Sequence, residues 1–321
     1  MIRVTTGSRL HFGLFAPGNG GKRQFGGVGL MIERPALRVS VTPAAKWSAT
    51  GPCADRALAV GRAFAKSQAL AESSAFAIQV QDCPLEHIGL GTGTQLALAV
   101  TRAIASILGF NVSTPELACA AGRGARSALG IHGFERGGFL VDGGKGPSTA
   151  VAPLIAWHPF PDDWRVLLII PRTGQGEHGT RERDAFAFLS GRNVSQATSD
   201  LARIVLLEML PSLVEHDLPA FGQAVYEFNR RVGEMFEAWQ GGVYSHEETA
   251  TLIDLLRKKG ITCVGQSSWG PTVFAIAEEV HLRQVAESFH REFDSMDAEI
   301  VLTKAAVSGA HIESLSGEQG A

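Results

Sequence analysis

Regular spacing of apolar residues predicts strands in the first part of the chain. In "LRVSVT" (residues 37–42) and "FAIQVQ" (residues 76–81) every second residue is apolar. A period of two is typical of a strand with one buried face. "SRLHFGLF" (residues 8–15) alternates in the same way, so its polar residues are expected to share one face.

Helical spacing follows in residues 55–67 and 95–108, and Gly109 fits a left-handed stop after the second helix. "STPE" (residues 113–116) combines a capping box with a proline near the helix start, so the next helix is expected to begin there. We expect that helix to end at the glycines of "GRGARSALGIHGFERGG", which lead into a strand around "FLVD".

The character of the chain changes near residue 160. Three prolines and an Asp-Asp pair mark a crossing before the buried strand "RVLLII". Helices are predicted over residues 199–209, 218–239 and 247–259. Strands "ITCVG" and "TVFAIA", a helix over residues 280–294 and a strand "AEIVLT" then complete an α+β pattern. Residues from about Ser308 onward are small and polar, and we expect them to be frayed.

Length and composition indicate an ordinary globular protein. The chain has 321 residues, which favours two domains of roughly 150 residues, here 1–160 and 161–321. Lys and Arg number 29 against 32 Asp and Glu, so no basic field favours nucleic acid as a partner. The N-terminus lacks an apolar block and "VLLII" is too short to span a bilayer, so we expect a cytoplasmic protein without membrane contact.

Four cysteines, at positions 53, 83, 119 and 263, lie far apart in the sequence and form no CxxC pair. This spacing predicts neither a zinc site nor a disulfide framework. We interpret the cysteines as small buried hydrophobic residues in a reducing compartment.

"GLGTGT" stands at the predicted start of the helix that contains residues 95–108. Glycines before a helix start let a phosphate approach unpaired backbone N–H groups, so Gly89, Gly91, Thr92, Gly93 and Thr94 are candidate phosphate-binding residues. A threonine hydroxyl could also bind magnesium. The spacing is neither a Walker motif nor GxGxxG with a later acidic residue, and a tight turn before a core helix explains it almost as well.

The wider pattern P-x(4)-GLG-[ST]-x-[ST] resembles the phosphate-loop motif of the GHMP kinase superfamily, which includes galactokinase, homoserine kinase and mevalonate kinase. Three further stretches, "SRLHFGLF", "GIHGFERGGFLVDGG" and "VGQSSWGPTVFA", are similar to one family within it, the β-ribofuranosylaminobenzene 5'-phosphate synthases of methanopterin biosynthesis. The resemblance implies a two-domain α+β fold, with a ribosomal-S5-like N-terminal domain, a ferredoxin-like C-terminal domain and an active site in the cleft between them.

Two departures from the kinase pattern argue against phosphoryl transfer. The kinases carry an SGxD segment whose Asp activates the substrate hydroxyl, but the matching stretch here is "SALG", with Gly130 in place of the Asp. The glycine-rich third kinase motif is replaced by "GQSSWGP", which contains a bulky tryptophan. An ATP-dependent small-molecule kinase and a non-catalytic ligand sensor remain as alternatives.

The reaction implied by the resemblance joins phosphoribosyl pyrophosphate to 4-aminobenzoate and releases carbon dioxide and pyrophosphate. Departure of pyrophosphate builds positive charge on the anomeric carbon, so Mg²⁺ and cationic side chains on the phosphates would stabilise the transition state. The chemistry needs no strong base, but it needs an aromatic slot and exclusion of water. A homodimer is left open.

Candidate catalytic residues follow from the same stretches. Arg9 and His11 share a strand face, which is either solvated or in contact with substrate anions; His11 would be a hydrogen-bond donor or proton shuttle near neutral pH. Glu135 and Asp142 bracket "RGGFLV", where a carboxylate could contact ribose or, as Asp142 with Thr94, hold magnesium. A turn-forming role is the more common one for such carboxylates.

Further candidates are assigned to binding. Arg126 and Arg136 could neutralise phosphates, although surface arginines are the common case. In "GQSSWGP", we expect Gln266, Ser267 and Ser268 to be substrate ligands and the exposed Trp269 to form a pocket wall, although a simple turn would also explain the motif.

"GQGEHGTRER" (residues 174–183) is a charged glycine loop at the end of a strand. A solvated loop explains it, and an active-site lid is the functional alternative. In a lid, Glu177, His178 and Arg181 would contact the substrate.

Overall fold

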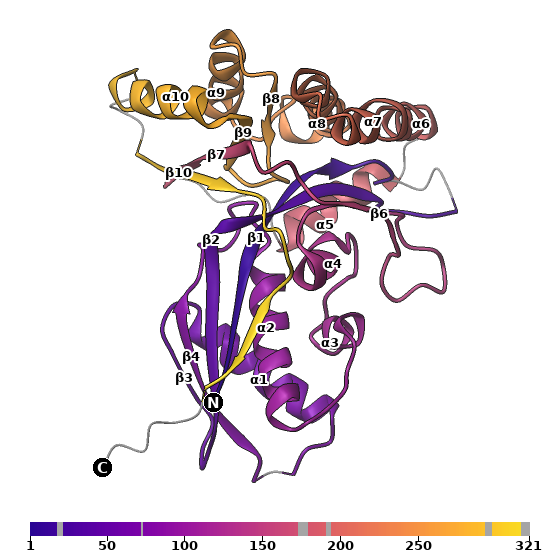
Figure 1. Cartoon of the computed structure of the whole chain (residues 1–321). Coiled ribbons are helices and arrows are strands. Elements are labelled where there is room, and N and C mark those ends of the chain that lie inside the picture. Colours follow the sequence, from indigo (N-terminus) through magenta and orange to yellow (C-terminus); the bar gives the residue numbers. More distant parts are fainter. Residues whose placement is uncertain (18–21, 72, 173–178, 191–193, 293–296, 316–321) are drawn as a thin grey trace.

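The computed structural model describes residues 1–17, 22–71, 73–172, 179–190, 194–292 and 297–315. Two sheets organise them (Figure 1). The first has the order β11-β1-β2-β4-β3, with β5 pairing with β2 and β6 with β5. Its strands are β1 (Ile2–Leu14), β2 (Gly27–Ala44), β3 (Ser48–Thr50), β4 (Ala75–Asp82), β5 (Phe139–Asp142), β6 (Leu154–His158) and β11 (His311–Ser314).

The second sheet is antiparallel throughout, in the order β10-β7-β9-β8. Its strands are β7 (Trp164–Pro171), β8 (Cys263–Gln266), β9 (Val273–Glu278) and β10 (Ala298–Lys304). The chain passes from the first sheet to the second between β6 and β7. The mixture of helices and strands in both parts confirms the predicted α+β class.

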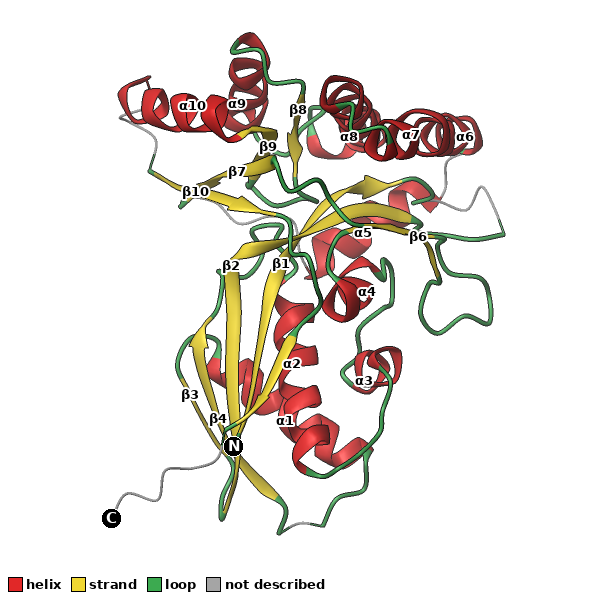
Figure 2. Cartoon of the chain, viewed as in Figure 1, coloured by secondary structure: helices red, strands yellow, loops and turns green. Residues whose placement is uncertain are grey.

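Helices cover the sheets in layers (Figure 2). One face of the first sheet carries α1 (Ala54–Ser67), α2 (Thr92–Ile107), α3 (Thr114–Ala120) and α4 (Leu129–Arg136). The rest of the chain contributes α5 (Gly179–Ser190), α6 (Ser195–Ile204), the π-helical turn η1 (Val205–Met209), α7 (Leu210–Val214), α8 (Leu218–Gln240), α9 (Glu247–Lys258) and α10 (Glu279–Glu292). None of the helices within the described ranges has the length and apolar character needed to cross a membrane.

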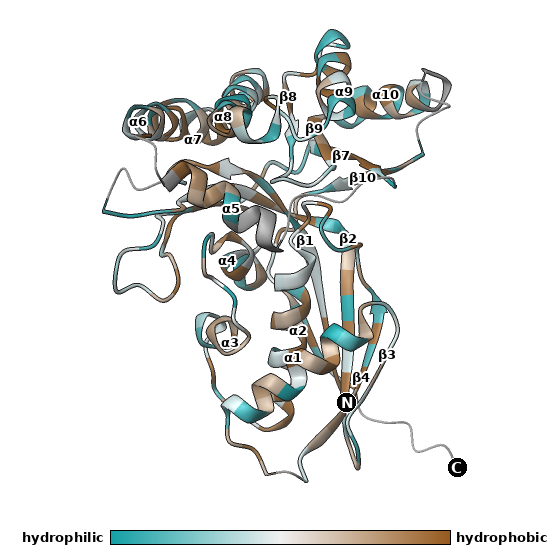
Figure 3. Cartoon of the chain, turned by 180° about the vertical axis from the view of Figure 1, so that it is seen from behind, coloured by the Kyte–Doolittle hydropathy of each residue, from teal (hydrophilic) through white to brown (hydrophobic). Residues whose placement is uncertain are grey.

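Strand β7 is apolar on both faces because each face meets a different core. Val166 and Leu168 join Leu10 and Phe12 of β1 in a core shared by the two halves of the chain, whereas Leu167 packs with α9 and α10. Figure 3 shows the same distribution, with hydrophobic positions along strands and α2 and hydrophilic ones on outer helix turns. Because both faces of β7 are buried, one in each core, "RVLLII" does not alternate between apolar and polar residues.

The glycine-rich loop before α2 touches the turn between β8 and β9 backbone to backbone. A Cβ atom on Gly89 would lie 2.1 Å from the Ser267 carbonyl oxygen, and one on Gly270 would lie 2.1 Å from the Ile88 carbonyl carbon. The Ser267 hydroxyl donates to the Gly89 carbonyl at 2.8 Å and accepts from the His11 N–H at 3.0 Å. We call this set of contacts the loop–turn contact; it joins the two halves beside the site described below.

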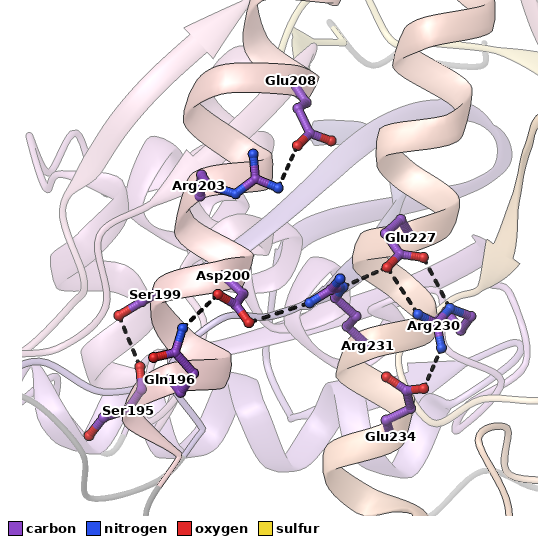
Figure 4. Close-up of polar contacts among 10 residues, drawn as sticks. All are labelled: Ser195, Gln196, Ser199, Asp200, Arg203, Glu208, Glu227, Arg230, Arg231 and Glu234. Carbon is purple, nitrogen blue, oxygen red and sulfur yellow. Dashed lines mark hydrogen bonds and ion pairs between the residues drawn. The ribbon is translucent and has the colours of Figure 1, made fainter.

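An ion-pair network joins α6 to α8 (Figure 4). Arg231 on α8 lies 3.4 Å from Asp200 on α6 and 2.6 Å from Glu227 on its own helix. Arg230 pairs with Glu227 and Glu234, and its hydrogen bond contributes most to lowering the pKa of Glu227. Because these side chains are partly exposed, each pair adds little stability, and only the Arg231–Asp200 pair joins the two helices.

Most of the expected helices are present, with shifted ends. The helix expected over residues 95–108 begins earlier, at Thr92, and its predicted apolar face is buried. The capping box is confirmed, since Ser113 and Glu116 exchange hydrogen bonds at the start of α3. The α4 helix was not expected, because its glycines indicated a loop; the protein accommodates them where the helix packs on β2 and β5.

Two other expectations were wrong. Residues 311–314 are not frayed, because β11 pairs with β1 and adds a C-terminal strand to the N-terminal sheet. The cysteines are not uniformly buried: Cys119 is exposed, Cys53 and Cys83 are half-buried with their sulfur atoms 3.4 Å apart, and only Cys263 is buried. Sequence separation concealed the Cys53–Cys83 contact, which the fold creates.

We predict that Gly270→Ala weakens the loop–turn contact. The new Cβ would meet backbone atoms that cannot rotate away, so the free energy of unfolding should fall by about 1–3 kcal/mol. Gly242→Ala is the matched control, since the nearest atom to its Cβ would be the Tyr244 carbonyl oxygen at 3.6 Å. Urea unfolding of both variants measures the difference; equal midpoints would contradict the prediction.

Candidate active site

A cavity of about 580 Å³ lies beside the loop–turn contact. Its wall combines β1, the start of α2, residues 122–127, α5, α8 and the turn after β8. The volume is in the range of small-molecule sites. Residues from both halves of the chain therefore enclose one space, as expected for a cleft between domains.

Positive charge gathers where β1 meets the start of α2. Arg9 lines the cavity and packs on Gly91, whose Cβ would lie 3.0 Å from the Arg9 Nε. Gly91 caps α2 in the left-handed conformation, with φ 73°, and supplies no side chain to the helix start. Thr94, in the first turn, also lines the cavity. The helix start and the guanidinium together form an anion-binding environment.

Arg123 is a second cation at this end of the cavity, and the sequence analysis did not select it. Its Nε is buried and has no hydrogen-bond partner among the described residues, and a Cβ on Gly93 would lie 3.4 Å from its Nη2. Burial lowers the pKa of Arg123, and the neighbouring charge of Arg56 lowers it further. A half-buried guanidinium with an unsatisfied donor is suited to an anionic ligand. In the sequence, "GRGAR" gave only the weak signal of an arginine between glycines.

His11 is buried and lines the same cavity, and its Nδ1 has no hydrogen-bond partner in the described part of the chain. Burial lowers the pKa of the His11 imidazole well below its ordinary value, and the Arg9 charge lowers it further. The ring is therefore neutral near pH 7. This fits the expected hydrogen-bonding role, but not that of a proton shuttle titrating near neutrality.

Aromatic rings form another part of the wall. Trp269 lies 4.6 Å from Phe236 and 5.1 Å from Phe186, measured between ring centroids. Arg126 lies over the Phe186 ring at 4.7 Å and also lines the cavity. The structure thus places Trp269 in a pocket wall, as the sequence indicated, but half-buried in an aromatic cluster rather than exposed.

The polar residues of "GQSSWGP" divide into different roles. Ser267 is fully buried and both its hydroxyl contacts belong to the loop–turn contact. Gln266 lines the cavity, but its side-chain amide binds Ser245 through two hydrogen bonds. Ser268 is exposed at the cavity and its N–H donates to the His11 carbonyl. Of the two serines expected as ligands, only Ser268 has a position that fits.

Three charged candidates are not among the described residues that line the cavity. Asp142 is fully buried and accepts hydrogen bonds from the Ser127 hydroxyl and the Ala128 and Gly144 N–H groups, so it holds the turn that precedes α4. Burial raises its pKa although those bonds lower it. Glu135 and Arg136 are exposed at the end of α4. Their expected catalytic, metal and phosphate roles stay predictions without support from these positions, since Asp142 is occupied by the turn before α4 and the other two side chains are exposed at the end of that helix.

Most residues of the glycine loop make structural contacts that the sequence did not indicate. The Thr92 hydroxyl donates to the Leu85 carbonyl at 3.0 Å, and Gly89 is occupied by the loop–turn contact. Gly93 lies under Arg123 and Gly91 under Arg9. Of the phosphate-binding residues expected in this loop, Thr94 is the one whose side chain reaches the cavity.

Glu177 and His178 lie outside the described residues. Arg181 belongs to α5, within a segment expected to be a loop, and its side chain also lies outside the described part of the structure.

The donor set of the cavity does not fit a magnesium ion held by the protein. No carboxylate is among the described residues that line it, and the described chain contains no group of three His, Cys, Asp or Glu side chains placed for a metal. Magnesium bound to proteins generally uses one or two carboxylates besides phosphates. We therefore derive no step through a resident metal.

Both halves of the chain are similar to known proteins. The GHMP kinases N-terminal domain matches residues 57–138 and the GHMP kinases C-terminal domain matches residues 209–295. The β-ribofuranosylphenol 5'-phosphate synthase of Archaeoglobus fulgidus is 33% identical, over 98% of this chain and 100% of its own. The synthase of the same name from Methanocaldococcus jannaschii is 30% identical, over 94% and 97%.

The chain belongs to the GHMP kinase superfamily. At this identity and coverage it also belongs to the family of these synthases within that superfamily, as the motifs predicted. The fold agrees: the M. jannaschii mevalonate kinase superposes with a TM-score of 0.69 at 10% identity, covering 95% of this chain and 98% of the kinase.

We predict that His11 makes stability depend on pH. Because its folded-state pKa lies below the ordinary 6.5, the unfolded chain binds the proton more readily, and stability is lost as pH falls from 6.5 towards the folded pKa. Urea unfolding gives the decrease in the free energy of unfolding between about pH 7.5 and about pH 5. This decrease should be smaller in His11→Asn than in the wild-type protein, by ~1 kcal/mol or more. The same loss in both proteins would contradict a neutral buried His11.

Proposed function

We propose that the protein is a decarboxylating phosphoribosyltransferase that joins phosphoribosyl pyrophosphate to 4-aminobenzoate in synthesis of a methanopterin-type carrier. One observation carries the proposal: the described cavity wall unites Arg9, Arg123, Arg126, the start of α2 and aromatic rings, and contains no acidic side chain. Such a wall suits two anionic substrates, one of which has an arene ring. The names of the relatives give independent support for this class of reaction.

The leaving pyrophosphate would bind where Arg9, Arg123 and Thr94 surround the α2 start. The bond between the anomeric carbon and the pyrophosphate oxygen breaks with its electron pair on the oxygen. Guanidinium groups and backbone N–H groups stabilise that developing charge without moving. Arg123 is the main contributor, because its buried donor has no partner within the described chain until an anion arrives.

The aromatic acid would lie against Trp269, Phe186 and Phe236, with its carboxylate towards Arg126. The ring carbon bearing the carboxylate attacks the anomeric carbon, and the C–CO₂ bond then breaks and returns its electron pair to the ring. Carbon dioxide leaves, so no proton has to be abstracted. The aromatic wall excludes water, which would otherwise capture the sugar cation.

The structure gives no support to the kinase alternative. Gly130, which the motif resemblance aligns with the kinase Asp, lines the cavity next to Thr94. A general base for a substrate hydroxyl is therefore missing from the described wall, and neutral His11 does not replace a carboxylate in that position.

The relatives are named for a phenol product, whereas the sequence analysis favoured the aminobenzene product. The two products differ in the substituent opposite the carboxylate of the aromatic acid. An amino or a hydroxyl group there donates electrons to the attacking carbon, so 4-hydroxybenzoate is the second substrate to test.

The decisive experiment incubates the protein with phosphoribosyl pyrophosphate, Mg²⁺ and carboxyl-labelled 4-aminobenzoate or 4-hydroxybenzoate. We expect release of labelled carbon dioxide that requires both substrates. ATP-dependent phosphorylation of a small alcohol would favour the kinase alternative, and binding without turnover would favour the sensor.

We predict that Arg123→Gln lowers kcat by roughly 10²-fold, because one pre-positioned donor to the leaving group is lost. We also predict that Thr94→Val raises KM for phosphoribosyl pyrophosphate by roughly 10-fold while the fold stays intact.

Steady-state kinetics measure the effects of both substitutions. Arg62→Gln, an exposed position on α1, is the control and should retain wild-type kinetics; unchanged kinetics in Arg123→Gln would remove this arginine from the site.

A further inference from the structure

Two buried polar atoms on the second half of the chain have no partner within the described structure. They are the Oε1 of Gln240, at the end of α8, and the hydroxyl of Tyr244 shortly after it. Both residues line the cavity. An unpaired buried acceptor and an unpaired buried hydroxyl each cost stability, so their presence beside a cavity indicates a ligand group that completes them.

The orientation of Gln240 is determined by its own hydrogen bonds. Its Nε2 donates to the Gly242 and Val243 carbonyl groups, each at 2.9 Å. The amide nitrogen is therefore satisfied and Oε1 remains as an acceptor only. Ser245, two residues after Val243, is held by Gln266 through two hydrogen bonds. The segment that carries these groups is thus anchored at both ends.

Tyr244 complements this acceptor. Burial raises the pKa of its phenol, with a further contribution from nearby Tyr226, so the hydroxyl stays protonated and can donate as well as accept. A ligand group that donates to Gln240 and either donates to or accepts from Tyr244 would satisfy both. Aromatic amines and phenols have this property, whereas an unsubstituted ring does not.

The location of the pair agrees with the geometry of the reaction. Gln240 and Tyr244 come from the α8 side of the cavity, whereas Arg9, Arg123 and Thr94 come from the first half of the chain. In a benzoate with a 4-substituent, that substituent is opposite the carbon that attacks. An aromatic acid whose reacting carbon faces the pyrophosphate end therefore presents its substituent towards the other wall.

We propose that Gln240 and Tyr244 form a specificity subsite for the 4-amino or 4-hydroxyl group of the aromatic acid. The proposal rests on the proposed function and adds the residues that select the substituent. The subsite accepts either group, since an amine donates one N–H to each residue and a phenol donates to Gln240 and accepts from Tyr244. It rejects benzoate, which leaves both buried groups unpaired.

The test measures binding by calorimetry, with pyrophosphate and Mg²⁺ in place of phosphoribosyl pyrophosphate so that no turnover occurs. The ligands are 4-aminobenzoate, 4-hydroxybenzoate and benzoate. Wild-type protein should bind both substituted acids about tenfold or more tighter than benzoate. Gln240→Leu and Tyr244→Phe should weaken binding of the substituted acids and leave the affinity for benzoate unchanged. The difference in affinity between the substituted acids and benzoate should therefore become smaller.

Gln196→Leu is the matched control, because Gln196 is exposed on α6 and is not part of the described cavity wall; it should preserve the wild-type difference in affinity between the substituted acids and benzoate. Equal weakening of all three ligands in the Gln240 and Tyr244 variants, or no weakening of any, would overturn the subsite. If wild-type protein binds none of the benzoates, the proposed function itself fails. Binding with the expected selectivity but no carbon dioxide release would retain the subsite and reject the transferase reaction.

Discussion

The arrangement of the site depends on the approach of two backbones at the loop–turn contact. Gly89 and Gly270 leave no room for a Cβ atom, and Ser267 hydrogen-bonds to both the glycine loop and β1. This contact holds the start of α2, which packs on the first sheet, against the turn between β8 and β9 of the second sheet. The cationic and aromatic parts of the cavity come largely from different halves of the chain, and this contact, together with the shared core, holds them around one space.

The charge of the cavity follows from what burial does to each group. His11 stays neutral because ionisation in a buried site is costly, whereas Arg123 keeps a guanidinium that lacks a partner among the described residues. Leaving such a group unpaired destabilises the empty protein, and an anionic ligand would remove that cost. Sites commonly retain this kind of unfavourable feature because function requires it.

Patterns of short range could be read from the sequence because their causes are local. The helix over α2, the capping box at Ser113 and the strand that positions Arg9 and His11 depend on neighbouring residues. Burial and pairing depend on contacts made by residues distant in sequence, so the sequence did not show that Asp142 is buried or that the cysteines differ in exposure. Asp142 satisfies the start of α4, and α4 was itself concealed by its glycines.

The sequence by itself determined the family, the fold class and the stretches that carry the site, since motif spacing and periodicity are properties of the chain. Tertiary structure alone decided which side chains meet. It brought Arg123 beside the start of α2 and assigned Ser267 to the loop–turn contact. It also left the Gln240 Oε1 and the Tyr244 hydroxyl without a partner among the described residues. The physical reason is that a hydrogen bond or an empty space exists between atoms in three dimensions, and no spacing along the chain specifies it.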